Sequence, residues 1–427
     1  MIYLIIFTIF FLLIVSYYAT GKDLIAPSNV MLMTFFLALI SALYNLSTWK
    51  FNLSLYSSLL IIFSLMITVI INGYVHQYYS RRNVKIKKEN LHSIRLYILI
   101  IFVGYLIMCI ILQYRVIRSI GKGSLSTLMY IYRLSTSYGT GTIEVKTISS
   151  KIADVATAIT YICLFNLILF FRSTSLVYKI INVLEIILWA FLYFLQGARF
   201  EVFSVCISAF IMFWFLRIRE TKIIKKFNIK QILKIMIIAI VLLYLFYILK
   251  DFVGRSSNKT IIEYLTSYLG GGIPCFDLFI KDPPAKSNVF GQETFYSLIE
   301  GLKRRGIINA PAVSFHKEFR TSNNVGIGNV YTALRDYYYD FGVLGMFIMH
   351  SIFSAFFSYL YEKTKIKMSY IKIIFLSILY NRIVFYMFNN MFFSSDCSIS
   401  FCFKAIFIIL LFNILMKREI WGRKIKI

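Results

Sequence analysis

The chain consists largely of apolar blocks that are separated by shorter polar segments. Each block is close to the roughly 20 residues that a helix needs to cross about 30 Å of hydrocarbon. None shows the alternation of apolar and polar positions that is typical of strands in a membrane barrel. The pattern therefore predicts about eleven membrane-spanning helices, which are Met1–Thr20, Ser28–Ser47, Leu55–Val75, Ile94–Tyr114, Ile152–Phe171, Leu176–Leu195, Phe200–Leu216, Gln231–Leu249, Phe341–Tyr361, Tyr370–Asn390 and Ile399–Met416.

The composition agrees with a protein that lies in lipid. Of the 427 residues, 59% are hydrophobic and only 15% are charged, and the mean hydropathy is +0.74. A soluble domain is usually about half apolar and about a quarter charged. We therefore predict a single polytopic membrane domain over 1–427, of the all-α integral membrane class.

Basic residues indicate which connections face the cytoplasm. Alternate connections and the C-terminal tail together hold 24 Lys and Arg, in 21–29, 78–95, 172–179, 217–230, 362–372 and the segment from Lys417. The other short connections hold only Lys50 and Arg199. Because short loops rich in Lys and Arg stay in the cytoplasm, we expect a cytoplasmic C-terminus and, with eleven spans, a periplasmic N-terminus. The net charge of +27 is thus an orienting charge and does not indicate a nucleic-acid partner.

Two long segments fall on the predicted periplasmic side. The segment 250–340 is too long for a passive connection in a compact protein, and its mixture of aromatic, aliphatic and charged residues is not that of a disordered chain. In 115–151, the spacing of Leu125, Leu128, Met129 and Tyr132 predicts a short amphipathic helix. Such a helix lies in the headgroup plane or caps the helix bundle, and the sequence leaves both open. We expect 250–340 to cover an active site.

Arginines in these outer segments suit an anionic ligand, because the planar guanidinium matches phosphate. Arg199 stands out, since it lies in a tight outer hairpin against the positive-inside bias. Arg382 lies about half-way along a predicted span, where an ionised residue costs about 2.5–3.5 kcal/mol. The alternative for each arginine is contact with water or lipid headgroups. The candidates are Arg199, Arg255, Arg304, Arg305, Arg320, Arg335 and Arg382.

The outer segments also hold groups that are able to transfer protons. His316 is the histidine that lies in the predicted periplasmic segments. The ordinary imidazole pKa of about 6.5 suits a general base near neutral pH. Asp336 and Asp340 lie at the end of the same segment. Surface exposure without a catalytic role is the alternative for His316. The other histidines are scattered and no carboxylates have ligand spacing, so we predict neither a metal nor a cofactor.

Four stretches resemble the oligosaccharide repeat-unit polymerases, the O-antigen polymerases of Wzy type. The hairpin Gln196–Arg199 is similar to the family's small-residue-then-Arg turn. The stretches Tyr268–Ile273 and Phe290–Phe295 are similar to its large-loop pattern. The run Asn329–Gly345 looks like the family's passage from the large loop into the next span. The resemblance covers roughly 190–345.

The resemblance implies a polymerase of the bacterial inner membrane with a GT-C-like polymerase/ligase architecture and a large periplasmic loop. Such an enzyme transfers a growing glycan, O-antigen or capsule-like, from undecaprenyl pyrophosphate to a lipid-linked repeat unit. The implied partners are these lipid-linked units, membrane lipids and a chain-length-regulating co-polymerase. The hypothetical catalytic residues are His316, Arg199 and Arg335, and substrate or pyrophosphate binding falls to Arg382, Arg320, Arg255, Arg305, Asp336 and Asp340.

Other functions remain open at this point. An O-antigen ligase uses the same donor and has a similar large outer loop, but it transfers the glycan to lipid A-core. A lipid-linked oligosaccharide flippase is a transporter, and the length of 250–340 counts against it. A scaffold or receptor without chemistry is the remaining class.

Overall fold

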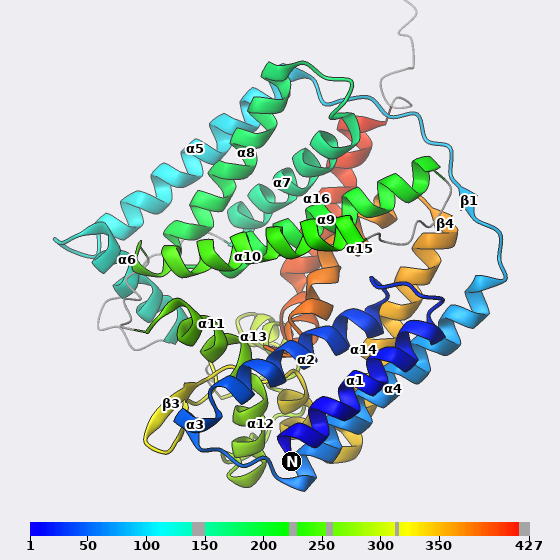
Figure 1. Ribbon diagram of the computed structural model, residues 1–427. Helices are drawn as coiled ribbons and strands as arrows, with labels where there is room; N and C mark the ends of the chain where they lie inside the picture. Colours follow the sequence, from blue (N-terminus) through cyan, green and yellow to red (C-terminus); the bar gives the residue numbers. More distant parts are fainter. Residues whose placement is uncertain (139–149, 222–228, 253–258, 312–315, 418–427) are drawn as a thin grey trace, which may run out of the picture.

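The computed structural model describes residues 1–138, 150–221, 229–252, 259–311 and 316–417 (Figure 1). Eleven long helices coincide with the predicted spans. They are α1 (Ile2–Ala19), α2 (Pro27–Tyr44), α4 (Leu55–Ser80), α5 (Leu96–Arg118), α7 (Ser150–Phe170), α8 (Leu176–Leu195), α9 (Phe200–Thr221), α10 (Ile229–Phe252), α14 (Leu334–Ile366), α15 (Tyr370–Val384) and α16 (Ile399–Met416).

Nine of these helices, within the described part of the chain, are long and apolar enough to cross a membrane. The two others are α10 and α15. With 15 residues, α15 is shorter than the roughly 20 residues that a perpendicular crossing needs. The side chains that face outward from the nine helices are predominantly apolar, such as Phe7, Ile101 and Ile406. The protein is therefore a helical, multi-pass membrane protein.

Shorter elements lie between the long helices. The helical ones are α3 (Leu46–Trp49), α6 (Leu125–Arg133), η1 (Leu134–Tyr138), α11 (Ile261–Gly270), α12 (Gly272–Lys281), α13 (Tyr296–Lys303) and η2 (Phe392–Asp396). The strands are β1 (Lys85–Ile86), β2 (Arg320–Ser322), β3 (Val325–Gly328) and β4 (Lys367–Met368). The predicted amphipathic helix in 115–151 is present as α6, with Leu128, Met129 and Tyr132 buried. The predicted periplasmic segment 250–340 holds α11, α12, α13, β2 and β3 in its described parts.

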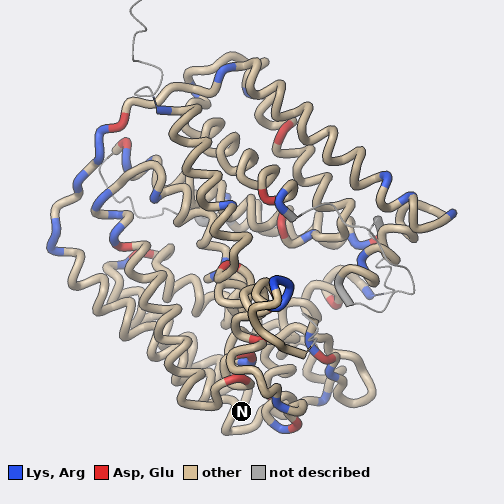
Figure 2. The backbone as a smooth tube through the Cα atoms, turned by 180° about the vertical axis from the view of Figure 1, so that it is seen from behind, with Lys and Arg blue, Asp and Glu red and all other residues tan. Residues whose placement is uncertain are grey.

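The long helices form two groups that α15 joins (Figure 1). In one group α1, α2, α4 and α14 pack together, and in the other α5 packs on α8 while α7 packs on α16. The helix α15 contacts α9 in the second group and both α2 and α14 in the first. Lys and Arg concentrate toward the two ends of this bundle, and the helical rods between them carry few charges (Figure 2).

Connections that the sequence predicts to lie on the same side of the membrane lie at the same end of the structure. At one end, which we call the basic end, β1 pairs in parallel with β4, and Leu91 bridges to Lys417. Arg219 donates hydrogen bonds to the carbonyls of Met368 and Lys87 at the same end. The basic end thus gathers 78–95, 362–372 and the start of the tail.

The opposite end, which we call the loop end, gathers 45–54, 259–311, 316–340 and 391–398. Asn323, in the turn between β2 and β3, donates to the carbonyl of Thr48. Lys281 donates to the carbonyl of Asn52. In addition, α13 packs on η2. All the site residues discussed below lie at this end.

Two glycine features shape the loop end. Gly342 has φ 68° and ψ −166°, so it breaks α14 and separates Leu334–Phe341 from the apolar remainder of the helix. Gly270 and Gly272 allow close approach, since a Cβ atom would lie 2.5 Å from the backbone nitrogen of Ala42 at Gly270 and 2.6 Å from the carbonyl oxygen of Met387 at Gly272. These contacts seat the α11–α12 junction against the bundle.

Candidate functional site

Arg199 lies in the hairpin between α8 and α9 and points into the protein. Gly197, with φ +75°, makes the turn after α8. The Arg199 side chain is buried, with 4% of the residue exposed. Its Nη1 atom donates to the carbonyl of Phe246 at 3.1 Å, and its Nη2 atom donates to the hydroxyl of Tyr264 at 3.0 Å. The guanidinium carbon lies 4.1 Å from the Phe246 ring centroid.

The charge of Arg199 is not balanced by a carboxylate. Among the described residues, no Asp or Glu lies within ion-pair distance of its guanidinium, and its Nε atom has no hydrogen-bond partner. A buried cation without a counter-charge is costly, and proteins usually pair such groups. The cation–π contact with Phe246 offsets only part of this cost. The guanidinium of Arg199 is therefore suited to binding an anionic ligand.

Two further cations lie beside Arg199, and we call Arg133, Arg199 and Lys250 the basic cluster. Lys250, at the end of α10, is buried and its ammonium lies 5.2 Å from the ring of Tyr264. The Arg133 side chain, from α6, packs against Gly197, where a Cβ atom would lie 3.2 Å from its Cδ atom. Burial raises the pKa of the Tyr264 hydroxyl to about 12, although Arg199 acts in the opposite direction. The hydroxyl thus stays neutral among these cations.

Sequence reasoning missed Arg133 and Lys250. Each follows an apolar helix and looks like a residue that ends it. No local signal marks them, because both lie in the long outer segments 115–151 and 250–340, where basic residues are not unusual. Only the packing of α6 and α10 against the α8–α9 hairpin brings them to Arg199.

Arg335 lies in the first turn of α14 and is almost completely buried, at 1% exposure. Its Nη1 atom bonds to Glu293 and lies 3.3 Å from Asp336, and its Nη2 atom lies 2.8 Å from Glu318. Its guanidinium also lies over the rings of Phe279, Tyr331 and Tyr339, at 4.8, 5.2 and 5.3 Å. The cation is therefore enclosed by three carboxylates and three aromatic rings.

Lys317 and Asp340 complete what we call the Arg335 network. Lys317 lies 2.6 Å from Glu293 and 3.2 Å from Asp336. Asp340 accepts a hydrogen bond at 2.6 Å from the backbone nitrogen of Thr294, which fixes the segment that carries Glu293. Arg335 and Lys317 thus pair with Glu293, Glu318 and Asp336, whereas backbone N–H groups bind Asp340. Within the described residues no group of three or more His, Cys, Asp or Glu is arranged to hold a metal ion.

His316 is half-buried and directly precedes Lys317. Its position in the chain places it at the border of the Arg335 network, next to a residue that contacts two of the carboxylates. The residues 312–315 before it lie outside the described part of the chain. The catalytic role of His316 stays a prediction.

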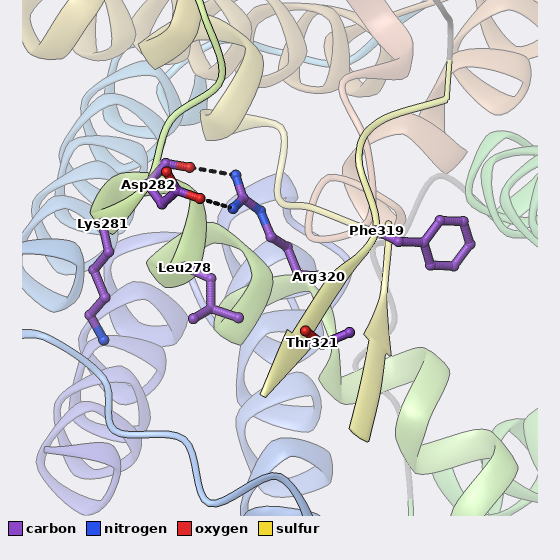
Figure 3. Close-up of a pocket in the computed structure, with 6 residues that line it drawn as sticks. All are labelled: Leu278, Lys281, Asp282, Phe319, Arg320 and Thr321. Carbon is purple, nitrogen blue, oxygen red and sulfur yellow. Dashed lines mark hydrogen bonds and ion pairs between the residues drawn. The ribbon is translucent and has the colours of Figure 1, made fainter. Parts of the chain in front are cut away.

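A small pocket opens next to the Arg335 network, with a volume of about 270 Å³ (Figure 3). We call it the loop-end pocket, and it is lined by Leu278, Lys281, Asp282, Phe319, Arg320 and Thr321. Arg320 donates to the carboxylate and carbonyl oxygens of Asp282, at 3.0 and 2.6 Å. Arg320 also lies 3.1 Å from Glu318, whose other oxygen binds Arg335. Glu318 therefore joins the pocket to the buried network.

Arg382 forms a two-pronged ion pair with Asp396. Its Nε and Nη2 atoms lie 2.7 and 2.8 Å from the two carboxylate oxygens. The helix α15 ends at Val384, before the predicted span end at Asn390, and Arg382 lies in its last turn. Its charge is balanced by Asp396, on η2.

The predicted residues therefore fall into three groups. The structure brings Arg320, Arg335, Asp336 and Asp340 together, whereas Arg199 and Arg382 each have separate partners. Helices α11 and α12 link the Arg335 network to Arg199. Tyr264 on α11 accepts a hydrogen bond from Arg199, and the ring of Phe279 on α12 lies under the guanidinium of Arg335. Arg305 is exposed after α13, and its guanidinium donates to the carbonyl of Gly301 at 2.9 Å. Arg255 lies outside the described residues.

Comparison with known proteins adds no family assignment to this geometry. Models of protein families, curated proteins and solved structures were each compared with the chain, and none of them matches it.

Proposed function

We propose that the chain is a polysaccharide polymerase, for O-antigen or a capsule-like glycan, which acts on lipid-linked repeat units. It transfers a growing glycan from undecaprenyl pyrophosphate to a repeat unit that is itself lipid-linked. The proposal places the loop end in the periplasm, on the charge distribution of the short connections, and the chain in the bacterial inner membrane. A GT-C-like architecture and a chain-length-regulating co-polymerase belong to the same proposal.

The observation that carries this proposal is the unbalanced charge of Arg199. A pyrophosphate is a compact dianion or trianion, and Arg199 offers it a buried cation whose Nε atom has no hydrogen-bond partner among the described residues. Negative charge grows on the pyrophosphate as the glycan leaves it. Fixed donors in a site of low polarity stabilise such charge strongly, because they need no reorganisation during the reaction. The cluster therefore suits both donor binding and leaving-group stabilisation.

The Arg335 network and the loop-end pocket suit the acceptor. A hydroxyl oxygen of the acceptor sugar attacks the anomeric carbon of the donor, and the bond from that carbon to the pyrophosphate oxygen breaks. The hydroxyl proton goes to a base, for which we assign His316, with the partly exposed carboxylate of Glu318 as the alternative. General-base help of this kind is typically about 10²–10⁴-fold.

Arg335 and Arg382 have a different task in this scheme. Both guanidinium groups already hold carboxylates, so either would bind pyrophosphate only after displacing them. We therefore assign Arg335 to the positioning of Glu293 and Glu318. Arg382 positions the segment of Asp396, between α15 and α16.

The test is reconstitution of the purified protein with lipid-linked repeat units. We expect longer lipid-linked oligomers to accumulate, both with and without a metal chelator. An O-antigen ligase would instead leave the repeat units unchanged until lipid A-core is added and would then glycosylate that acceptor. Absence of elongation with active substrate would refute the polymerase.

A further inference from the structure

The loop-end pocket combines apolar surface with polar groups on its rim (Figure 3). Leu278 supplies carbon surface, whereas the exposed ring of Phe319 points away from the other labelled side chains. The carboxylate of Asp282 is 88% exposed and retains lone pairs beyond the one that Arg320 uses. The hydroxyl of Thr321 faces the same space. A pyranose ring has matching properties, because it presents C–H groups on its faces and hydroxyls around its edge.

The charges that line this pocket are balanced, in contrast to that of Arg199. Lys281 lies 2.6 Å from the carboxylate of Asp277. Arg320 lies 3.0 Å from Asp282 and 3.1 Å from Glu318. A dianion would have to separate these pairs, whereas a neutral ligand binds to their remaining donors and acceptors. The electrostatics therefore favour an uncharged, polyhydroxylated ligand.

The size and place of the pocket limit this ligand further. A volume of about 270 Å³ is close to the lower limit of about 300 Å³ for small-molecule sites, which suits a single ring. Glu318 binds Arg320 at the pocket and Arg335 in the network, so a ring in the pocket has the network on one side and water on the other.

From these observations we propose that the loop-end pocket is a subsite for one neutral monosaccharide ring of the acceptor glycan. The ring packs on Leu278, and Asp282, Arg320 and Thr321 bind its hydroxyls. The proposal rests on the polymerase function above and names the substrate class of one part of that site.

The proposal is tested by measuring the binding of two probes to the full-length protein in detergent. Each probe is tested on variants of the loop-end pocket and on a variant of the basic cluster. The first probe is the saccharide that mild acid releases from the lipid-linked repeat unit of the same strain. The second is inorganic pyrophosphate. The variants are Asp282→Asn and Thr321→Val in the pocket and Arg199→Ala in the basic cluster. Lys286→Ala, an exposed lysine on the loop that follows Asp282, is the matched control.

We expect Asp282→Asn to weaken saccharide binding by about tenfold, which is the order expected when a hydrogen bond to a charged group is lost. Thr321→Val should weaken it less, and both variants should bind pyrophosphate as the wild type does. Arg199→Ala should show the reverse pattern, and Lys286→Ala should change neither. Unchanged saccharide affinity in both pocket variants would overturn the subsite, even if the protein polymerises glycan. If the crossed pattern is found but the reconstituted protein elongates nothing, the saccharide site stands and the polymerase fails.

Discussion

Arg382 and Asp396 are 14 residues apart in the chain and form a two-pronged ion pair at 2.7 and 2.8 Å. The pair joins the last turn of α15 to η2, so it fixes the segment that leads into α16. Both side chains are largely buried, at 14% and 6% exposure. Removing one partner would leave the other charge buried and alone.

We expect Arg382→Met or Asp396→Asn alone to destabilise the protein by about 3–5 kcal/mol, the usual cost of breaking a buried pair. The double variant should cost clearly less than the sum, because it leaves no unpaired charge. Thermal or denaturant unfolding of the purified variants in detergent measures both quantities. Additive effects of the two single changes would show that the pair does not couple the two segments.

Arg199→Ala should abolish the ladder of polymer lengths in cells while leaving the protein folded. Loss of a buried and unbalanced cation removes affinity for pyrophosphate but does not break an ion pair among the described residues. Arg199→Lys should recover only part of the activity, since an ammonium lacks the planar fork. Polymer gels and gel filtration of the tagged protein report the two properties.

The control for Arg199 is Lys286→Ala, which removes an exposed basic residue at the same end of the molecule. It should leave the ladder unchanged. A normal ladder in Arg199→Ala would remove Arg199 from the site.

His316→Ala should lower the rate of polymerisation by about 10²–10⁴-fold, the range for loss of a general base. Glu318→Gln is the informative comparison, because it keeps the shape of the side chain and removes its charge. If His316 is the base, its removal should also eliminate an ionisation from the pH–rate profile. Near-normal polymerisation by His316→Ala, together with a large loss in Glu318→Gln, would transfer the role to Glu318.

The hydrogen bonds of Asp277 lead us to expect that the stability of the folded protein depends on pH. Asp277 accepts hydrogen bonds from Ser54 and Ser57 and lies 2.6 Å from Lys281. Burial alone would raise the pKa of Asp277, but the bonds from Lys281, Ser57 and Ser54 outweigh it and lower that pKa. Asp277 therefore stabilises the fold fully above its unfolded pKa of about 3.9. This contribution is lost as the pH falls through the lower pKa of the folded state.

Unfolding of the wild type and of Asp277→Asn between pH 7 and pH 3 tests this dependence. The variant should be less stable at pH 7, and the difference should shrink as the solution becomes acidic. An equal difference at every pH would exclude a role for the charge of Asp277.

Gly272→Ala should destabilise the junction of α11 and α12. Its Cβ atom would lie 2.6 Å from the carbonyl oxygen of Met387, which belongs to the backbone and has little freedom to move. We expect a loss of about 1–3 kcal/mol, the usual effect of overpacking. Gly121→Ala is the control, since nothing lies within 4 Å of its Cβ position. Equal stability of the two variants in unfolding experiments would contradict the close contact.

The sequence predicted the long helices well, because each segment that lies in lipid must be apolar by itself. A helix such as α5 must be apolar along its whole length to lie in hydrocarbon, whatever its neighbours are. The helix α15 is the exception. It ends at Val384 although the apolar residues continue to Phe388, and the carbonyl of Tyr386, beyond its end, bonds to the backbone nitrogen of Ala333.

The candidate site was predictable only in part. Arg199 was identifiable because a basic residue in a short outer hairpin is an exception to the positive-inside rule. The difference between Arg199, which lacks a carboxylate partner among the described residues, and Arg335, which has three, was not visible in the sequence. Glu293 and Arg335 are 42 residues apart, and their pairing depends on how the loop end folds.

By itself, the sequence determined that the protein is a helical membrane protein and which connections share an end, because apolar length and loop charge act locally along the chain. Only the tertiary structure decided which charges balance one another. It placed Arg133 and Lys250 beside Arg199, enclosed Arg335 among carboxylates and left a charge-balanced pocket at Arg320. Electrostatic energy depends on distances in space, and the chain order of these residues does not contain those distances.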